Sequence, residues 1–293
     1  MARKTQQALK SKSKKGLAAV AARQALSIAM DKKWSIAKRI AALAQATPLL
    51  ARSEKHLESL LGVLRDEREP VAVRLAALQT IQATSFDISS FAGVRGDYLL
   101  TLRKIAQDEN QDIRQRALGA LAREKDGFAQ KKLLEGLQDP QKALVSPEKA
   151  LQLLSYDPHA GAYDVARSIV DKPPNPTAKR EALRLLAADP SAAPIFEKTL
   201  LDKNELRENR QISAAALHGI APDKFQDLSR QIVLDSKDFD DIKASTLTAL
   251  SQFGDPTKLT ADSSLQDTAD QLKNKGSSKL RSSAVQFLSK YGR

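Results

Sequence analysis

The hydrophobic positions of this chain recur in short phrases in which the first, fifth, sixth and ninth residues are mostly apolar or small. On an α-helix this spacing places the four side chains on one face, as expected where a helix packs against a neighbour. A second amphipathic stretch precedes each phrase, so the pattern predicts one helical hairpin per period. The eight phrases are KRIAALAQA (38–46), VRLAALQTI (73–81), IRQRALGAL (113–121), SPEKALQLL (146–154), AKREALRLL (178–186), ISAAALHGI (212–220), IKASTLTAL (242–250) and LRSSAVQFL (280–288).

The distances between phrases are typical of a helical repeat protein. Measured between sixth residues, successive phrases lie 35, 40, 33, 32, 34, 30 and 38 residues apart. Stacked hairpins of about this length bury a shared core that no single hairpin could bury alone. Prolines fall between the stretches or, like Pro147 and Pro194, in first turns, so we expect helix interiors to be free of proline. Aromatic residues make up only 4% of the chain, which also favours an all-α fold.

Through the pattern VR-x-x-A-L-x-x-L, and most fully through IKASTLTALSQFGD at 242–255, the chain resembles the HEAT family, in particular the HEAT-like repeats named for phycobilisome lyases. The resemblance covers about residues 17–290. It implies a right-handed α-solenoid of about eight HEAT-like hairpins, in which the second helices line a concave surface suited to an extended partner. Two phrases depart from the pattern, because Pro147 and Ser213 stand where the family usually has a basic residue.

The chain divides into two parts on charge. Residues 1–60 contain 13 Lys and Arg against 3 acidic residues, whereas the rest is nearly neutral, with 34 against 32. We predict a disordered basic arm at 1–16, followed by the solenoid at 17–293. Within the solenoid the link TSFDISSFAGVRG (84–96) is longer than its counterparts, and forms either an extra turn or a mobile loop.

The second residue of the phrase is basic in six of the eight copies. On a helix this position shares a face with positions five, six and nine, so its aliphatic stem can pack inward while its charged end reaches a carboxylate. Acidic residues precede several of these helices, namely Glu67, Glu69, Asp108, Glu109, Asp112, Asp238, Asp240 and Asp241. We therefore predict repeated ion pairs between hairpins, with a phosphate or partner contact as the alternative. The basic residues are Arg39, Arg74, Arg114, Lys179, Lys243 and Arg281.

The positions that face away from the core suggest what the concave surface binds. Positions three, four and seven carry four basic and two acidic residues over eight helices, too little charge to neutralise a phosphate backbone. Small and uncharged polar side chains predominate, which favours a protein or peptide partner over DNA. We expect the groove contacts to include Gln79, Gln115, Gln152, Arg184, His218, Thr248 and Gln286.

The basic arm offers a second mode of binding. Its cations could form an electrostatic tether to nucleic acid, an anionic membrane surface or an acidic partner, with a strong salt dependence. The alternatives are a solvated tail and a targeting peptide, since no acid precedes Asp31. The cations are Arg3, Lys4, Lys10, Lys12, Lys14 and Lys15.

No pattern indicates catalysis. The chain has no cysteine, and its three histidines share no ligand spacing, so we expect no metal and no cofactor. Motifs for phosphate loops, serine hydrolases and zinc proteases are absent. HEAT-like alkylpurine DNA glycosylases use an aromatic-lined cleft with a carboxylate, but Trp34 is the only tryptophan here and no aromatic cluster follows the groove helices.

From these observations we predict a non-catalytic scaffold or adaptor that binds a protein partner along the concave face. The alternative is a nucleic-acid-associated protein that contacts phosphates through the arm, and after it a glycosylase-like or lyase-like enzyme. The apolar run LAAVAA (17–22) is too short to span a membrane, and we expect a cytoplasmic protein, with organelle targeting by the N-terminus as the other option.

Overall fold

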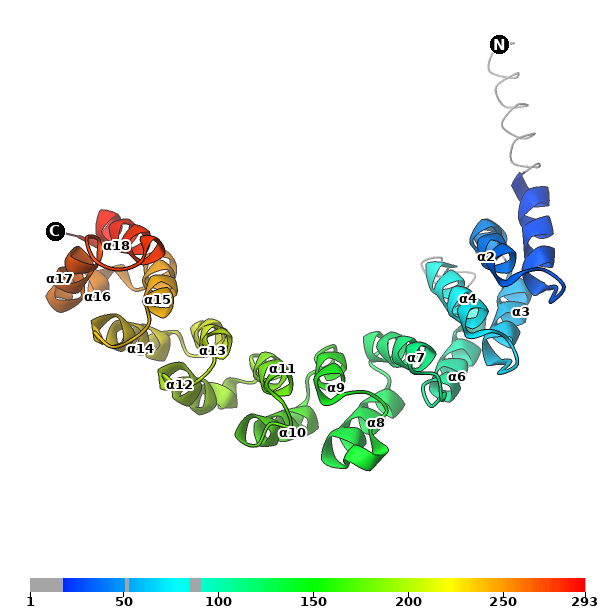
Figure 1. Cartoon of the computed structure of the whole chain (residues 1–293), viewed down its shortest axis with the longest axis horizontal. Coiled ribbons are helices and arrows are strands. Elements are labelled where there is room, and N and C mark those ends of the chain that lie inside the picture. The colour runs from blue at the N-terminus through cyan, green and yellow to red at the C-terminus, as the bar shows by residue number, and fades with distance from the viewer. Residues whose placement is uncertain (1–17, 51–52, 85–90, 293) are drawn as a thin grey trace, which may run out of the picture. The chain divides into compact units, whose positions relative to one another are not determined.

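The structure is a computed structural model, and it describes residues 18–50, 53–84 and 91–292. In these residues every regular element is a helix, which confirms the all-α class. Contacts divide the chain into unit 1, residues 1–133 with 142–145, and unit 2, residues 134–141 with 146–293. Each unit is described by itself. Figure 1 shows the helices of each unit.

Unit 1 consists of helical hairpins that follow one another in chain order. The second helices pack on each other, α2 on α4 and α4 on α7, while the first helices α3 and α6 form another layer. The short 3-10 helix η1 supplies an extra turn in the long link, of which 85–90 lie outside the described residues. The elements are a helix at 18–30, α2 (Ile36–Leu50), α3 (Glu54–Arg65), α4 (Val71–Thr84), η1 (Ala92–Val94), α6 (Arg95–Ile105) and α7 (Gln111–Arg123).

Unit 2 repeats this two-layer arrangement. The second helices α9, α11, α13, α15 and α18 pack in sequence, and α12, α14 and α17 form the layer of first helices. Helix α8 (Gly127–Gln138) crosses the boundary between the units. The elements after it are η2 (Pro140–Lys142), α9 (Pro147–Leu154), α10 (Ala160–Asp171), α11 (Pro176–Leu186), η3 (Pro190–Ala192), α12 (Ala193–Leu201), α13 (Arg207–Ile220), α14 (Pro222–Leu234), α15 (Asp240–Phe253), α16 (Pro256–Ala261), α17 (Ser263–Leu272) and α18 (Ser278–Tyr291).

The predicted phrases lie in the second helices, and their repeated leucines form the core. Leu43, Leu118, Leu183 and Leu247 are fully buried. Among the described residues no helix is long and apolar enough to cross a membrane. One expectation about proline is wrong, because Pro48 lies inside α2. The Ala44 carbonyl, which loses its usual helix donor there, accepts a hydrogen bond from the Thr47 hydroxyl at 2.9 Å instead.

Buried guanidinium groups join consecutive hairpins, as the sequence predicts. The Nε of Arg39 donates to the Ala29 carbonyl of its own hairpin at 2.8 Å, and its two Nη atoms bind the Glu69 carboxylate of the next hairpin at 2.7 and 3.1 Å. Arg74 likewise donates to the Leu64 carbonyl at 3.1 Å and to Asp108 at 2.7 Å. Both arginines are only 3% exposed. They are structural residues, and neither offers its charge to a ligand.

The other predicted members of this series differ from one another. Lys179 forms an ion pair with Glu205 of the next hairpin. Arg114 binds only carbonyl groups, including that of Leu144 at 2.7 Å. Lys243 is buried and Arg281 is exposed, and neither has an ion pair with a described residue. The predicted ion pair is therefore confirmed for Arg39, Arg74 and Lys179 and wrong for the remaining three.

The sixth phrase has a different register from the one the hydrophobic pattern predicts. Arg210, three residues before Ser213, donates from Nε to the Leu200 carbonyl at 2.7 Å and from its Nη atoms to Asp238 at 2.8 and 2.6 Å. As with Arg39 and Arg74, the carbonyl lies ten residues before the arginine. Arg210 is fully buried and is the missing basic residue of this hairpin.

A second series of ion pairs, which the sequence analysis missed, joins the first helices. Arg103 binds Asp126 with Nη2 to Oδ2 at 2.7 Å, Arg167 pairs with Asp189, and Arg230 binds Asp262 at 2.5 Å. Each of these aspartates also accepts a backbone N–H at the start of the following helical segment, from Phe128, Ser191 and Leu265 respectively. One carboxylate thus caps a helix and holds the preceding hairpin.

We predict that Arg210→Met lowers the free energy of unfolding by about 3–5 kcal/mol, because Asp238 is left buried without its cation. Urea unfolding of the full chain, followed by far-UV circular dichroism, measures the change. The control is Arg281→Met, at an exposed position, which should stay within about 0.5 kcal/mol. Similar losses in the two variants would contradict a structural role for the buried pair.

The stability of unit 1 should depend on pH through Glu69. Hydrogen bonds from Arg39 hold the pKa of Glu69 below its ordinary value of 4.5. A carboxyl group with a lowered pKa in the folded state stabilises the fold above its ordinary pKa, and this stabilisation disappears as the pH falls through the lowered value. We expect the urea concentration at the unfolding midpoint to decrease as the pH is lowered below about 4.5. The decrease should be smaller in Glu69→Gln, whose side chain at position 69 cannot titrate. Glu58→Gln, exposed on α3, should keep the wild-type profile.

Candidate functional site

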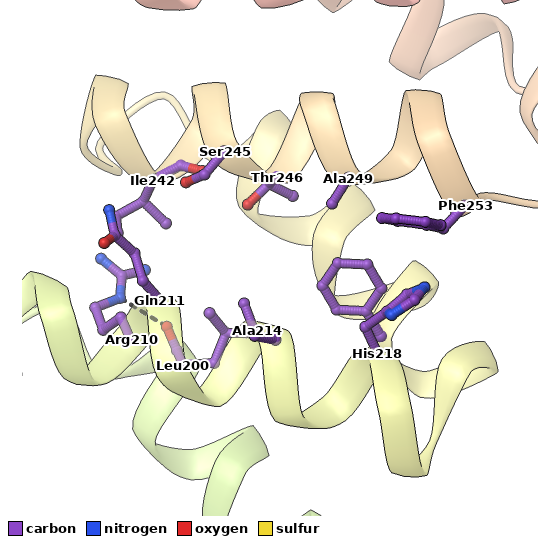
Figure 2. A pocket seen from close by; sticks show the side chains of 12 residues that line it. Leu200, Arg210, Gln211, Ala214, His218, Ile242, Ser245, Thr246, Ala249 and Phe253 are labelled. Carbon is purple, nitrogen blue, oxygen red and sulfur yellow. Dashed lines mark hydrogen bonds between the residues drawn. The ribbon is translucent and has the colours of Figure 1, made fainter. Parts of the chain in front are cut away.

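A pocket of about 260 Å³ lies within unit 2, between the second helices α13 and α15. Figure 2 shows side chains from both helices pointing into it. Its walls are largely hydrocarbon, and its polar side chains are few. The lining residues are Leu200, Arg210, Gln211, Ala214, Ala215, His218, Phe225, Ile242, Ser245, Thr246, Ala249 and Phe253.

Small side chains on both helices leave the space open. Ala214 of α13 faces Ala249 of α15 across the pocket, and Ala215 also lines it. Counted from the buried arginine, Ala214 takes the place that Leu43 and Leu78 take in their hairpins, four residues after Arg39 and Arg74. An alanine has three carbon atoms fewer than a leucine. The pocket therefore marks a position at which a helix lacks side-chain volume.

Three aromatic rings form one end of the pocket. The His218 ring lies 4.3 Å from that of Phe253 and 5.5 Å from that of Phe225, measured between centroids. Phe253 is 61% exposed, although a phenyl ring in contact with water is unfavourable. An exposed aromatic side chain beside a concave apolar wall is typical of a binding surface.

The floor of the pocket carries a charge that is already compensated. Arg210 is the charged residue of the lining, and its Nε and both Nη atoms donate to Leu200 and Asp238. The Ser245 hydroxyl is also used, by the carbonyl of Asp241 at 2.7 Å. Gln211 is exposed at the rim. The pocket is therefore suited to a neutral ligand.

The predicted groove residues do not gather at one place. Gln79 and Gln115 belong to unit 1, whereas the other five belong to unit 2. Of the seven, only His218 lines the pocket. The Thr248 hydroxyl is already engaged, with the Ala244 carbonyl at 2.9 Å and Ser283 at 3.0 Å. Exposed side chains are found at Gln79, Gln152, Arg184 and Gln286, and their role in a groove stays a prediction.

The cations on the neighbouring helix α11 are paired. Arg184 binds Glu181 at 2.8 Å and Glu208 at 3.2 Å, and Arg180 binds Glu208 at 3.1 Å. Glu181 is buried, although the sequence pattern placed it on the groove side. These guanidinium groups are compensated by carboxylates, so they are poorly placed to neutralise phosphates.

Two further predictions concern the arm and metals. Arg3, Lys4, Lys10, Lys12, Lys14 and Lys15 lie outside the described residues. In the described part of the chain no group of three or more His, Cys, Asp or Glu side chains could hold a metal ion.

Comparisons with known proteins give a likeness to solved structures but not to a family. No family model and no curated protein matches the chain. The chain is similar to the solved structure of human deoxyhypusine hydroxylase in complex with glycerol, with 13% sequence identity and a TM-score of 0.35. The match covers 81% of this chain and 96% of that one.

The sequence analysis predicts a chain that is not an enzyme, and the matching structure differs from that prediction. The matching structure is that of a hydroxylase, which is an enzyme. The prediction rests on the absence of known motifs, and that inference is wrong, since active sites can be assembled from residues on different helices without a local motif. At this level of similarity the match assigns no reaction to this chain.

Proposed function

We propose that this chain binds another protein through the second-helix surface of unit 2, and that the pocket between α13 and α15 holds one side chain of that partner. The observation that carries the proposal is the combination of a small apolar pocket with the exposed ring of Phe253 at its edge. Aromatic and aliphatic anchors that fill such pockets supply most of the binding energy at protein interfaces.

The size of the pocket favours a side chain over a free small molecule. Pockets for drug-sized ligands enclose about 300–1,000 Å³, whereas this one encloses about 260 Å³. A single anchoring side chain fits this space, and the remainder of the partner would contact the surrounding surface. Gln152 and Gln286 are exposed on second helices of the same unit and can hydrogen-bond to peptide groups.

The charges near the pocket support a protein partner over a nucleic acid. Arg180 and Arg184 are paired with Glu181 and Glu208, and Arg210 with Asp238. A phosphate backbone would have to compete with these carboxylates for each cation. A partner with neutral or mixed polar groups leaves the ion pairs intact.

Selection of peptides from a random display library against the full chain tests this proposal. We expect enriched peptides to share one large apolar or aromatic residue and to bind Ala214→Leu at least tenfold more weakly, because the leucine occupies the pocket. Phe253→Ala should weaken the same peptides without filling the space. Ala83→Leu, an exposed position on α4, adds the same atoms to unit 1 and should leave binding unchanged.

Circular dichroism and thermal melting show whether each variant retains its fold. Peptides that bind wild type and folded Ala214→Leu equally well would overturn the proposal, and so would a selection that enriches no peptide.

A further inference from the structure

We propose that the side chain held in this pocket is a tyrosine, selected through a hydrogen bond between its phenol group and the hydroxyl of Thr246. This inference rests on the proposed function and specifies the chemistry of the anchor. It depends on three features of the pocket: an unused hydroxyl group, a volume suited to one substituted aromatic ring, and the absence of a free charge in the wall.

Thr246 is only 3% exposed, and its hydroxyl makes no hydrogen bond with a described residue. Its oxygen is not among the enclosed unpaired atoms, so it is accessible from the pocket that the residue lines. Figure 2 shows it on α15, facing the space between α15 and α13. Three other threonines in helices of this unit satisfy their hydroxyl groups within the helix. Thr199, Thr248 and Thr268 each donate to the carbonyl four residues earlier, at 2.8, 2.9 and 2.8 Å. Thr246 therefore presents a hydrogen-bonding group to the pocket.

A hydroxyl group that a ligand covers without offering it a partner is unfavourable, so a ligand that supplies a partner is favoured over a ligand that does not. A hydrocarbon side chain such as phenylalanine or leucine would cover the Thr246 hydroxyl and leave it unpaired. A phenol group can both donate to and accept from that hydroxyl. The rings of Phe225 and Phe253 offer aromatic contacts to the body of the same side chain.

The volume agrees with a substituted ring. A cavity of about 150 Å³ is known to hold benzene, and this pocket is larger, at about 260 Å³. The additional space accommodates a ring together with a hydroxyl group and the first carbon of the side chain.

The electrostatics exclude a charged version of this ligand. Arg210 is fully committed to Leu200 and Asp238, so the wall offers no free cation to a phosphate or carboxylate. His218 is the other titratable residue of the lining. A phosphorylated tyrosine would therefore lose its hydration without gaining a counter-charge.

Titration of the full chain with p-cresol and with toluene, followed by NMR of the methyl groups of Ala214, Ala249 and Ile242, tests the inference. We expect p-cresol to bind about five- to tenfold more tightly than toluene, and p-cresyl phosphate to bind more weakly than either. Thr246→Val keeps the shape of the side chain without the hydroxyl and should abolish the preference for p-cresol. Thr248→Val, two residues along the same helix and outside the pocket, should retain it.

Equal affinity of wild type for p-cresol and toluene at these methyl groups would overturn the tyrosine assignment and leave the side-chain pocket intact. A preference for p-cresol that persists in Thr246→Val would also overturn it. Peptides that bind wild type more tightly than Ala214→Leu but contain no tyrosine would also overturn the tyrosine assignment. Peptides that bind both proteins equally well would instead overturn the proposed function.

Discussion

A buried guanidinium that binds two hairpins at once is the interaction on which the stacking of this protein depends. Arg39, Arg74 and Arg210 each take a carbonyl at or near the end of the first helix of their own hairpin and a carboxylate from the loop of the next. The carbonyl belongs to the turn of helix that has no partner of its own. A guanidinium displaced by one helical turn would lose both partners in a buried site, so each pair permits a single register between neighbouring hairpins.

The joints between hairpins are nevertheless not alike, and the loop sequences explain the difference. For each of the three arginines, the loop between the two helices of the next hairpin provides the carboxylate. Arg39 binds Glu69, Arg74 binds Asp108 and Arg210 binds Asp238. The loop before α18 reads KNKGS (273–277) and contains no acid, so Lys243 has no carboxylate to bind there. Since a repeat protein is held together by contacts between nearest neighbours, such differences make individual joints stronger or weaker.

Most of the fold follows from the sequence, because a helix face repeats every three to four residues and the leucines mark it throughout. The same periodicity explains the error at α13. Both Arg210 and Leu217 lie on the buried face of α13. When the nine-residue phrase is moved by three residues along this helix, apolar side chains still fall on the buried face, so hydrophobicity alone cannot select the register. With the phrase placed at 212–220, Ala214 takes the third position, which faces away from the core. The run of alanines at 214–216 was the available signal for missing volume.

The pocket itself could not be predicted, because it depends on the distance between two helices that meet only in the folded protein. The unused hydroxyl of Thr246 is likewise visible only in three dimensions, since its neighbours Ser245 and Thr248 carry the same group and use it locally. The sequence pattern does not predict the pairs Arg103–Asp126 and Arg167–Asp189 for a similar reason. Their acids lie in the connections between hairpins, whereas the periodic pattern directs attention to the loops within them.

The position of Arg210 and Leu200 in the pocket wall connects recognition to mechanics. The same side chain that fastens the sixth hairpin to the seventh also forms the floor on which a ligand would rest. Anything seated between α13 and α15 touches both hairpins, and it is released when they separate. Occupancy would therefore raise the free energy of local opening at that one joint, by an amount that grows with the concentration of the occupant relative to its dissociation constant.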